Sequence, residues 1–179
     1  MLSAAFHGGV GAGADASFSL ADKMEGQKKT TAINLSGTFP IELRAGYRMF
    51  LKNAGWFVDP VLCFKTAFAA VTKDSGSKFA FSLFPPFKFG SATLELRIGK
   101  VINDKLSVYA ICPSPEMRYS IASVFALTLQ TGAGVEYKLH RNVSLAGALR
   151  VGFASSFLKE IASAAVVGLE FHQSNYYGD

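Results

Sequence analysis

Apolar and polar residues alternate along most of the chain with a period of two, which places successive side chains on opposite faces of a β-strand. From Phe6 to Leu20, every second residue is apolar or small, and the residues between are glycine, serine, histidine or aspartate. Similar alternation recurs in six further segments, and a seventh, 106–112, is apolar on both faces. It predicts strands over 6–20, 31–51, 56–71, 92–98, 106–112, 126–139, 143–153 and 165–172.

The expected connections between these strands alternate in length. Short turns fall at 52–55, 103–105 and 140–142, and longer connections at 21–30, 72–88, 113–125 and 154–160. Up-and-down barrels of the outer membrane join an even number of strands in this way, with short periplasmic turns and long extracellular loops. We therefore predict an all-β, eight-stranded antiparallel up-and-down transmembrane β-barrel over 1–172, followed by a periplasmic tail over 173–179.

The turn at 52–55 fixes the register of its two strands, because the residues that flank it should pair with each other. Arg48 then lies opposite Asp59 on the polar face. In the same register, Glu42 lies opposite Lys65. Unlike charges that face each other on neighbouring strands stabilise the pair. The sequence therefore predicts two cross-strand ion pairs in this hairpin.

Two prolines and two cysteines lie inside the predicted strands. Pro40 and Pro60 cannot donate a hydrogen bond to a neighbouring strand, so we expect a local bulge at each. Cys63 and Cys112 fall on strands that another strand separates, so we expect no disulfide between them. The register of the hairpin around 103–105 stays open, because 106–112 is apolar on both faces.

Composition bears on which face of the barrel points inward. Of the 179 residues, 50% are hydrophobic and 17% are charged, against about 25% charged in an average soluble domain. The polar face is mostly small residues with scattered charges of both signs, which suits the narrow interior of an eight-stranded barrel. Buried charges need partners. We therefore expect a lumenal charge network formed by Glu42, Arg44, Arg48, Asp59, Lys65, Glu95, Arg97, Glu136, Arg150 and Glu170.

A soluble alternative remains open at this stage. A lipocalin-like barrel would fold without detergent and would line a cavity for an apolar ligand with the apolar face. The aromatic residues favour the membrane, because they cluster near the strand ends, where the girdles of outer-membrane barrels lie. These residues are Phe6, Phe18, Tyr47, Trp56, Phe68, Tyr137, Phe153 and Phe171.

The net charge of +5 is concentrated partly in the long connections, which include Arg118 and Lys159. Lysines there are either solvated loop tips or contacts for the phosphates of lipopolysaccharide, which basic clusters attract. The candidate lysines are Lys23, Lys28, Lys29, Lys73 and Lys78. Nucleic-acid binding has no support, since it would need a basic groove with stacking aromatic residues.

Two predicted hairpins, GAGVEYKLHRNVSLAGALRVGF (132–153) and LELRIGKVINDKLSVYA (94–110), resemble those of the OmpA-like outer-membrane barrel family. In that family, a Gly-rich strand ends in an aromatic residue, turns through Asn or Asp and restarts as hydrophobic-Ser-hydrophobic. The segment 167–171 is similar to the assembly signal in the last strand of that family. The resemblance implies a cell-surface protein in the outer membrane of a Gram-negative bacterium, with its signal peptide removed. We also expect a monomer.

The sequence gives catalysis little support. His172-Gln173-Ser174-Asn175 is similar to the His-x-Ser-Asn stretch of lipid A deacylases, but it lies past the last strand. The histidines are too scattered for a metal site. We therefore expect a non-enzymatic barrel without cofactor or metal, which acts as a membrane anchor, a surface-interaction protein or a narrow porin-like pore. Its expected partners are the lipid bilayer, lipopolysaccharide and a surface partner at the long loops. A lipid A deacylase-like barrel enzyme is a second alternative, beside the soluble lipocalin-like barrel.

Overall fold

The computed structural model describes residues 3–25, 28–51, 55–73, 79–83, 89–120, 123–154 and 160–172. Within these residues no helix is long and apolar enough to cross a membrane. The predicted tail over 173–179 and the lysines at 78 and 159 lie outside the described residues. The described strands are β1 (Ser3–Glu25), β2 (Lys28–Leu51), β3 (Trp56–Lys73), β4 (Ala80–Leu83), β5 (Phe89–Asn103), β6 (Leu106–Ser120), β7 (Ser123–His140), β8 (Val143–Ala154) and β9 (Glu160–His172).

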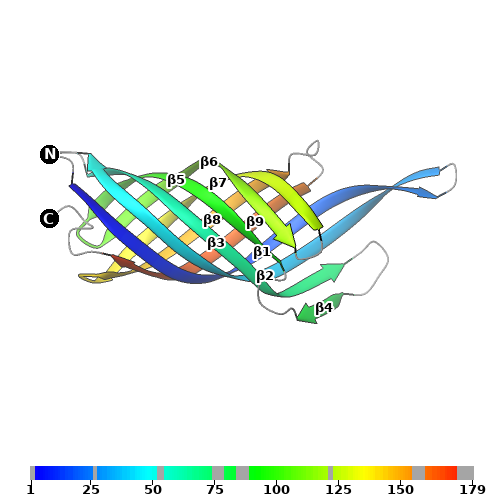
Figure 1. Cartoon of the computed structure of the whole chain (residues 1–179), viewed down its shortest axis with the longest axis horizontal. Coiled ribbons are helices and arrows are strands. Elements are labelled where there is room, and N and C mark those ends of the chain that lie inside the picture. Colours follow the sequence, from blue (N-terminus) through cyan, green and yellow to red (C-terminus); the bar gives the residue numbers. More distant parts are fainter. Residues whose placement is uncertain are drawn as a thin grey trace.

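Eight of these strands close into an antiparallel ring (Figure 1). The ring runs from β1 through β2, β3, β5, β6, β7 and β8 to β9, which pairs again with β1. β1 begins and β9 ends at the same end of the barrel, which also holds the short connections (Figure 1). We call this the turn end and the other the loop end. The predicted eight-stranded, up-and-down barrel is thus confirmed.

β4 is the strand that the alternation pattern did not predict. It pairs with β3 over Ala69–Thr72 and stands outside the ring, beyond the stretch where β3 pairs with β5 (Figure 1). The segment 79–83 lies in what we expected to be a long connection. Its backbone hydrogen bonds to β3 do not require a buried face, which explains why the pattern of buried positions misses it.

The connections at the loop end are shorter than expected, because the strands run on. β1 pairs with β9 only as far as Ser19, and β2 pairs with β3 only from Leu35 onward. Beyond those points 20–25 and 28–34 pair with each other and form a two-stranded arm past the ring (Figure 1). β6 likewise continues to Ser120, so the predicted connections over 21–30 and 113–125 are wrong. Backbone pairing continues there although the alternation has faded.

The β2–β3 register is the one that the turn predicts, with Glu42 opposite Lys65. The bulge at Pro40 is confirmed, since the register shifts by one residue between Phe39 and Pro40. The bulge expected at Pro60 is wrong. Pro60 pairs with β5 in regular register, and β2–β3 pairs resume unshifted on both sides of it. At Pro60 only the pairing of β3 with β2 is interrupted, and no residue is inserted.

The β5–β6 hairpin, whose register the sequence left open, pairs Lys100 with Val108. An irregularity between Val101 and Asn103 precedes the turn. A second irregularity falls in β6 between Ile111 and Ser114. The inward positions of β6 are therefore odd-numbered up to Ile111 and even-numbered from Ser114, as the burial of these residues shows.

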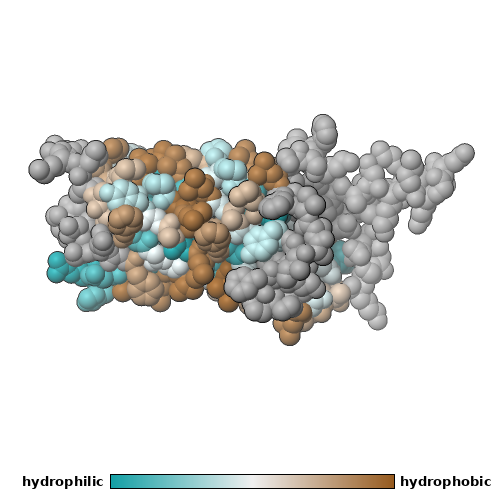
Figure 2. Space-filling view, in the orientation of Figure 1, coloured by the Kyte–Doolittle hydropathy of each residue, from teal (hydrophilic) through white to brown (hydrophobic). Residues whose placement is uncertain are grey.

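The apolar face of the barrel points outward. Large hydrophobic side chains such as Leu43, Phe64, Leu94 and Leu149 are exposed on the wall, and much of the visible wall is apolar (Figure 2). The charged face is buried inside the ring. A lipocalin-like barrel needs the opposite arrangement, so the soluble alternative is wrong.

The predicted girdle residues lie on this outer wall, as far as their side chains are described. Their exposure ranges from 37% at Tyr47 to 62% at Phe6, and these two rings contact each other with centroids 4.6 Å apart. The side chain of Phe18 lies outside the described residues. Exposed aromatic rings on an apolar wall are typical of membrane–water interfaces.

Candidate functional site: the charged interior of the barrel

Six charged side chains form a closed ring of alternating sign across the middle of the barrel. Strand alternation explains their position, because residues two apart on β2 and on β5 face inward together, and β8 and β9 each add one more. All six are 5% exposed or less. We call this set the charge ring; its members, in the order of their contacts, are Glu42, Arg150, Glu95, Arg97, Glu170 and Arg44.

Arg150 joins one half of the charge ring. Its Nη1 and Nη2 donate to the two carboxylate oxygens of Glu42 at 3.1 and 3.0 Å. Its Nε donates to Glu95 Oε1 at 2.5 Å. A guanidinium that binds a carboxylate through two parallel hydrogen bonds fixes its geometry as well as its charge. Arg150 thereby connects β8 with β2 and β5.

Arg97 and Arg44 complete the charge ring through Glu170 of β9. Arg97 donates to Glu95 at 3.1 Å and to Glu170 Oε1 at 3.2 Å. Arg44 donates to the same Glu170 oxygen at 3.0 Å and contacts Glu42 through its Nε. Three cations and three anions therefore alternate, and the ring has no net charge at neutral pH.

Glycine on β1 leaves room for this arrangement. A Cβ atom placed on Gly9 would lie 2.7 Å from the carbonyl oxygen of Leu169 and 3.0 Å from Cγ of Glu170. The inward face of β1 between His7 and Asp15 consists of glycines. Side chains from the other strands can therefore approach the β1 backbone closely.

A second charged cluster lies nearer the turn end. Arg48 donates to Asp59 at 3.1 Å and to Glu136 at 2.8 Å, which confirms the predicted Arg48–Asp59 pair and adds a partner from β7. His7 Nε2 lies 2.7 Å from Asp59 Oδ1. Ser144 donates to Glu136 at 2.7 Å. This cluster connects β1, β2, β3, β7 and β8.

Aromatic side chains close the interior on the turn-end side of these charges. The Arg48 guanidinium lies 3.9 Å from the centroid of Phe57, and that of Arg97 lies 4.9 Å from Tyr109. Phe57 and Tyr109 belong to a buried apolar cluster with Phe50, Ile111 and Ala148. We call this cluster the plug.

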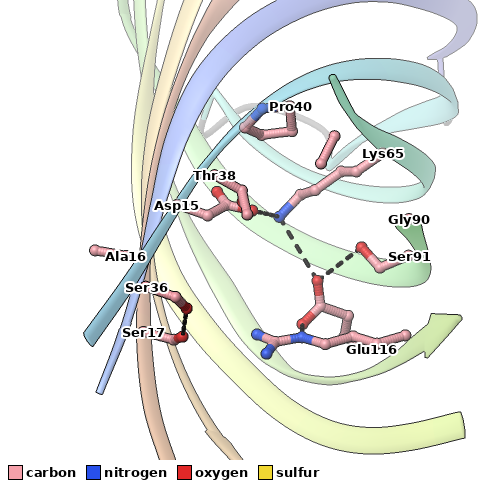
Figure 3. Close-up of a pocket in the computed structure, with 12 residues that line it drawn as sticks. Asp15, Ala16, Ser17, Ser36, Thr38, Pro40, Lys65, Gly90, Ser91 and Glu116 are labelled. Carbon is pink, nitrogen blue, oxygen red and sulfur yellow. Dashed lines mark hydrogen bonds and ion pairs between the residues drawn. The ribbon is translucent and has the colours of Figure 1, made fainter. Parts of the chain in front are cut away.

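A polar pocket of about 250 Å³ opens on the loop-end side of the charge ring (Figure 3). The Lys65 ammonium lies between two carboxylates there, 3.9 Å from Asp15 and 3.7 Å from Glu116. Glu116 also accepts hydrogen bonds from Ser91 and Thr128 at 2.8 and 2.7 Å. The Nε of Arg118 also donates to Glu116, at 2.9 Å.

The structure thus places all ten predicted lumenal charges inside the barrel, but their partners differ from the expected ones in one case. Glu42 and Lys65 face each other in register, yet their side chains bind elsewhere: Glu42 to the arginines of the charge ring and Lys65 to Asp15 and Glu116. Asp15 and Glu116 belong to β1 and β6, which do not pair with β3 and approach Lys65 only when the barrel closes. The expected Glu42–Lys65 ion pair is therefore wrong.

Among the described charged and histidine side chains of the interior, four were missed by the sequence reasoning. His7 and Asp15 stand on the polar face of the first predicted strand, so their position in the alternation could have identified them. Glu116 and Arg118 were assigned to a long connection. They lie on β6 beyond its irregularity, which hides their inward position from a strict count by two.

The remaining predicted residues lie apart from this interior. Lys23, Lys28 and Lys29 belong to the arm, and only their backbone is described. Lys73 ends β3, with its ammonium 4.8 Å from the centroid of Phe79. His172 ends β9, and the rest of the deacylase-like motif lies outside the described residues. Both cysteines are free, as expected.

Comparison with known proteins supports the fold and no closer relationship. No protein-family model and no curated protein sequence matches the chain. Among solved structures, Neisserial surface protein A is similar with a TM-score of 0.51 at 12% identity, over 94% of this chain and 98% of that one. Ail, the attachment invasion locus protein of Yersinia pestis, matches with a TM-score of 0.48 at 12% identity, over 93% of this chain and 98% of that one.

The match to Neisserial surface protein A shows the barrel fold, and the exposed apolar wall agrees with the outer-membrane barrel expected from the sequence. In such barrels the short turns face the periplasm and the longer connections face outward. The turn end of this chain corresponds to the periplasmic end of such barrels. The chain has the fold of the small, OmpA-like eight-stranded outer-membrane β-barrels.

Proposed function

We propose that this protein is a closed, non-conducting outer-membrane barrel whose function lies on its extracellular side, as a membrane-anchored surface-interaction protein. The observation that carries the proposal is the charge ring. Its six side chains reach across the interior from β2, β5, β8 and β9 and bind one another there.

The interior leaves little space for ions to pass. The interior of an eight-stranded barrel is just wide enough for side chains to fill. Here the charge ring fills the middle and the plug fills the periplasmic part. The polar pocket of about 250 Å³ lies above them. A conducting path would have to separate buried ion pairs, which is costly in a low-dielectric interior.

The extracellular side carries features that suit contact with a partner. The β1–β2 arm projects past the ring (Figure 1). The β3–β4 hairpin presents Phe79, Phe81 and Leu83, which are among the most exposed large hydrophobic residues described. The basic residues of these segments would attract the phosphates of lipopolysaccharide. We assign that contact to Lys23, Lys28, Lys29, Lys73 and Lys78.

The closed state can be tested by planar-bilayer conductance after refolding from urea into detergent. We expect no stepwise openings from the folded protein, with a porin in the same bilayer as positive control. Stepwise openings that persist in folded, heat-modifiable protein would overturn the closed barrel. They would make the interior charges selectivity residues of a narrow pore.

The surface role needs a separate measurement. Changing Lys28 and Lys29 together to Gln should weaken binding of the refolded protein to vesicles that contain lipopolysaccharide. Lys105→Gln, at an exposed position of the opposite end, is the matched control and should not change it. Equal binding by both variants would exclude the arm lysines as the phosphate contact.

A further inference from the structure

The outer wall holds a hollow of about 700 Å³ on its lipid-facing side. Two neighbouring rows of cross-strand partners form it. One row runs from Lys100 through Val108 and Val135 to Gly147, and continues to Val167. The other row is formed by Ile98, Ala110, Ala133 and Leu149. The hollow therefore crosses five strands, from β5 to β9, as a groove.

The smallest residues of the groove lie in its middle. Ala110 and Ala133 pair directly with each other, and Gly147 lies beside them on β8. Larger side chains such as Ile98 and Leu149 stand on either side. Its volume is within the range of about 300–1,000 Å³ typical of small-molecule sites. A slender, flexible apolar chain fits this shape.

The two ends of the groove differ in chemistry. At the periplasmic end Lys100 lies beside Trp56, with its ammonium 5.7 Å from the ring centroid. Trp56 is the first residue of β3, at the rim of the barrel, whereas Gly147 and Val167 lie farther from the turn end along their strands. The groove therefore runs from a positively charged end at the membrane interface towards the apolar middle of the outer wall.

We propose that this groove binds a phospholipid of the periplasmic leaflet with an anionic headgroup. One acyl chain lies over Ala110, Ala133 and Gly147, and the headgroup phosphate meets Lys100. Among the described residues that line the groove, Lys100 is the one that carries a charge, so an anion there would be paired. Trp56 has the place of an interfacial anchor, because tryptophan is enriched at the headgroup level.

A second copy of the chain fits this surface less well. A copy packed on the groove would cover Lys100, and none of the lining residues that the structure describes offers it a carboxylate. Burying a charge without a partner is unfavourable. A phospholipid supplies the anion and leaves the headgroup in contact with water.

The chain offers its own probe for this site, since Trp56 is its single tryptophan and lines the groove. The refolded barrel is placed in phosphatidylcholine bilayers in which a fixed fraction of lipid carries bromine on its acyl chains. Bromine quenches tryptophan fluorescence only at short range. We expect brominated phosphatidylglycerol to quench Trp56 severalfold more effectively than brominated phosphatidylcholine at equal mole fraction.

Two variants separate headgroup from acyl chain. Lys100→Gln should make the two brominated lipids equally effective, whereas Lys105→Gln, which alters a lysine outside the groove, should preserve the preference. Ala110→Leu with Ala133→Leu should reduce quenching by phosphatidylglycerol. The matched control, Ala12→Leu with Ala45→Leu, alters exposed outward positions on β1 and β2 and should not.

The outcomes distinguish this inference from the membrane-spanning barrel on which it rests. Equal quenching by both lipids in the unmodified protein, or a preference that survives Lys100→Gln, overturns the lipid site and leaves the barrel intact. Both lipids could instead quench weakly, with quenching that becomes stronger as the protein is diluted in the bilayer. That result would mean that a second copy covers the groove. Absence of quenching at every dilution would contradict membrane insertion itself.

Discussion

The charge ring makes a quantitative prediction for Arg150. Arg150→Met keeps most of the aliphatic volume but removes three hydrogen bonds, two to Glu42 and one to Glu95. Each of these carboxylates then retains one arginine of the ring, Arg44 or Arg97. Removing one partner of a buried ion pair costs about 3–5 kcal/mol, because the remaining charge is left desolvated.

Such a loss is large enough to measure directly. A free energy of about 1.4 kcal/mol is a factor of ten in an equilibrium constant, so the folded-to-unfolded ratio should fall by a factor of roughly 150 to 5,000. The assay is equilibrium urea unfolding of the barrel in lipid vesicles, followed by tryptophan fluorescence and by heat-modifiable migration in gels. Lys105→Met, at an exposed turn position, is the matched control and should stay within about 0.5 kcal/mol of the unmodified protein.

A double-mutant cycle with Glu42→Gln tests the reasoning behind the number. If Arg150 and Glu42 stabilise the barrel by binding each other, the double variant should lose less unfolding free energy than the two single variants together. The difference should be about 0.5–3 kcal/mol. Purely additive losses would refute the pairing. A loss below about 1 kcal/mol in Arg150→Met would show that water reaches the ring and screens its charges.

Three further predictions follow from the packing of the barrel. Gly134→Val should lower the free energy of unfolding by a few kcal/mol, because overpacking is destabilising and even a Cβ there would lie 2.3 Å from the Tyr109 ring. Adding Tyr109→Leu to this variant should restore most of the lost free energy, as measured by urea unfolding. Cys63 is 1% exposed, so a water-soluble maleimide should label it only after unfolding, and rapid labelling of folded protein, absent in Cys63→Ser, would contradict the packed interior. Replacing 20–33 by a short turn should change the unfolding free energy by less than about 1 kcal/mol, since the arm pairs mainly with itself; failure to fold would mean that the arm takes part in closing the barrel.

The turns and the alternation predict the ring of strands and even the register of β2 on β3, because both are local properties of the chain. The partners inside the barrel are not local. Glu42 and Arg150 are 108 residues apart and meet only through the stagger of the closed sheet, which the sequence of each hairpin leaves undetermined. The inward position of Glu116 was not predicted for a different reason. The irregularity between Ile111 and Ser114 changes which positions of β6 face inward.

The charge ring also selects the register of the barrel. A shift of one residue in a strand turns its whole inward face outward. A slip of β2 or β5 would place an arginine and a glutamate of the charge ring against lipid at the same time. An arginine on the lipid face near the bilayer midplane costs about 2–4 kcal/mol, and the ion pairs of the ring would be lost as well. An apolar core would stabilise the same ring of strands but would penalise this slip less, because aliphatic side chains are tolerated on both faces. The buried charges therefore contribute to the specificity of the fold as well as to its closure.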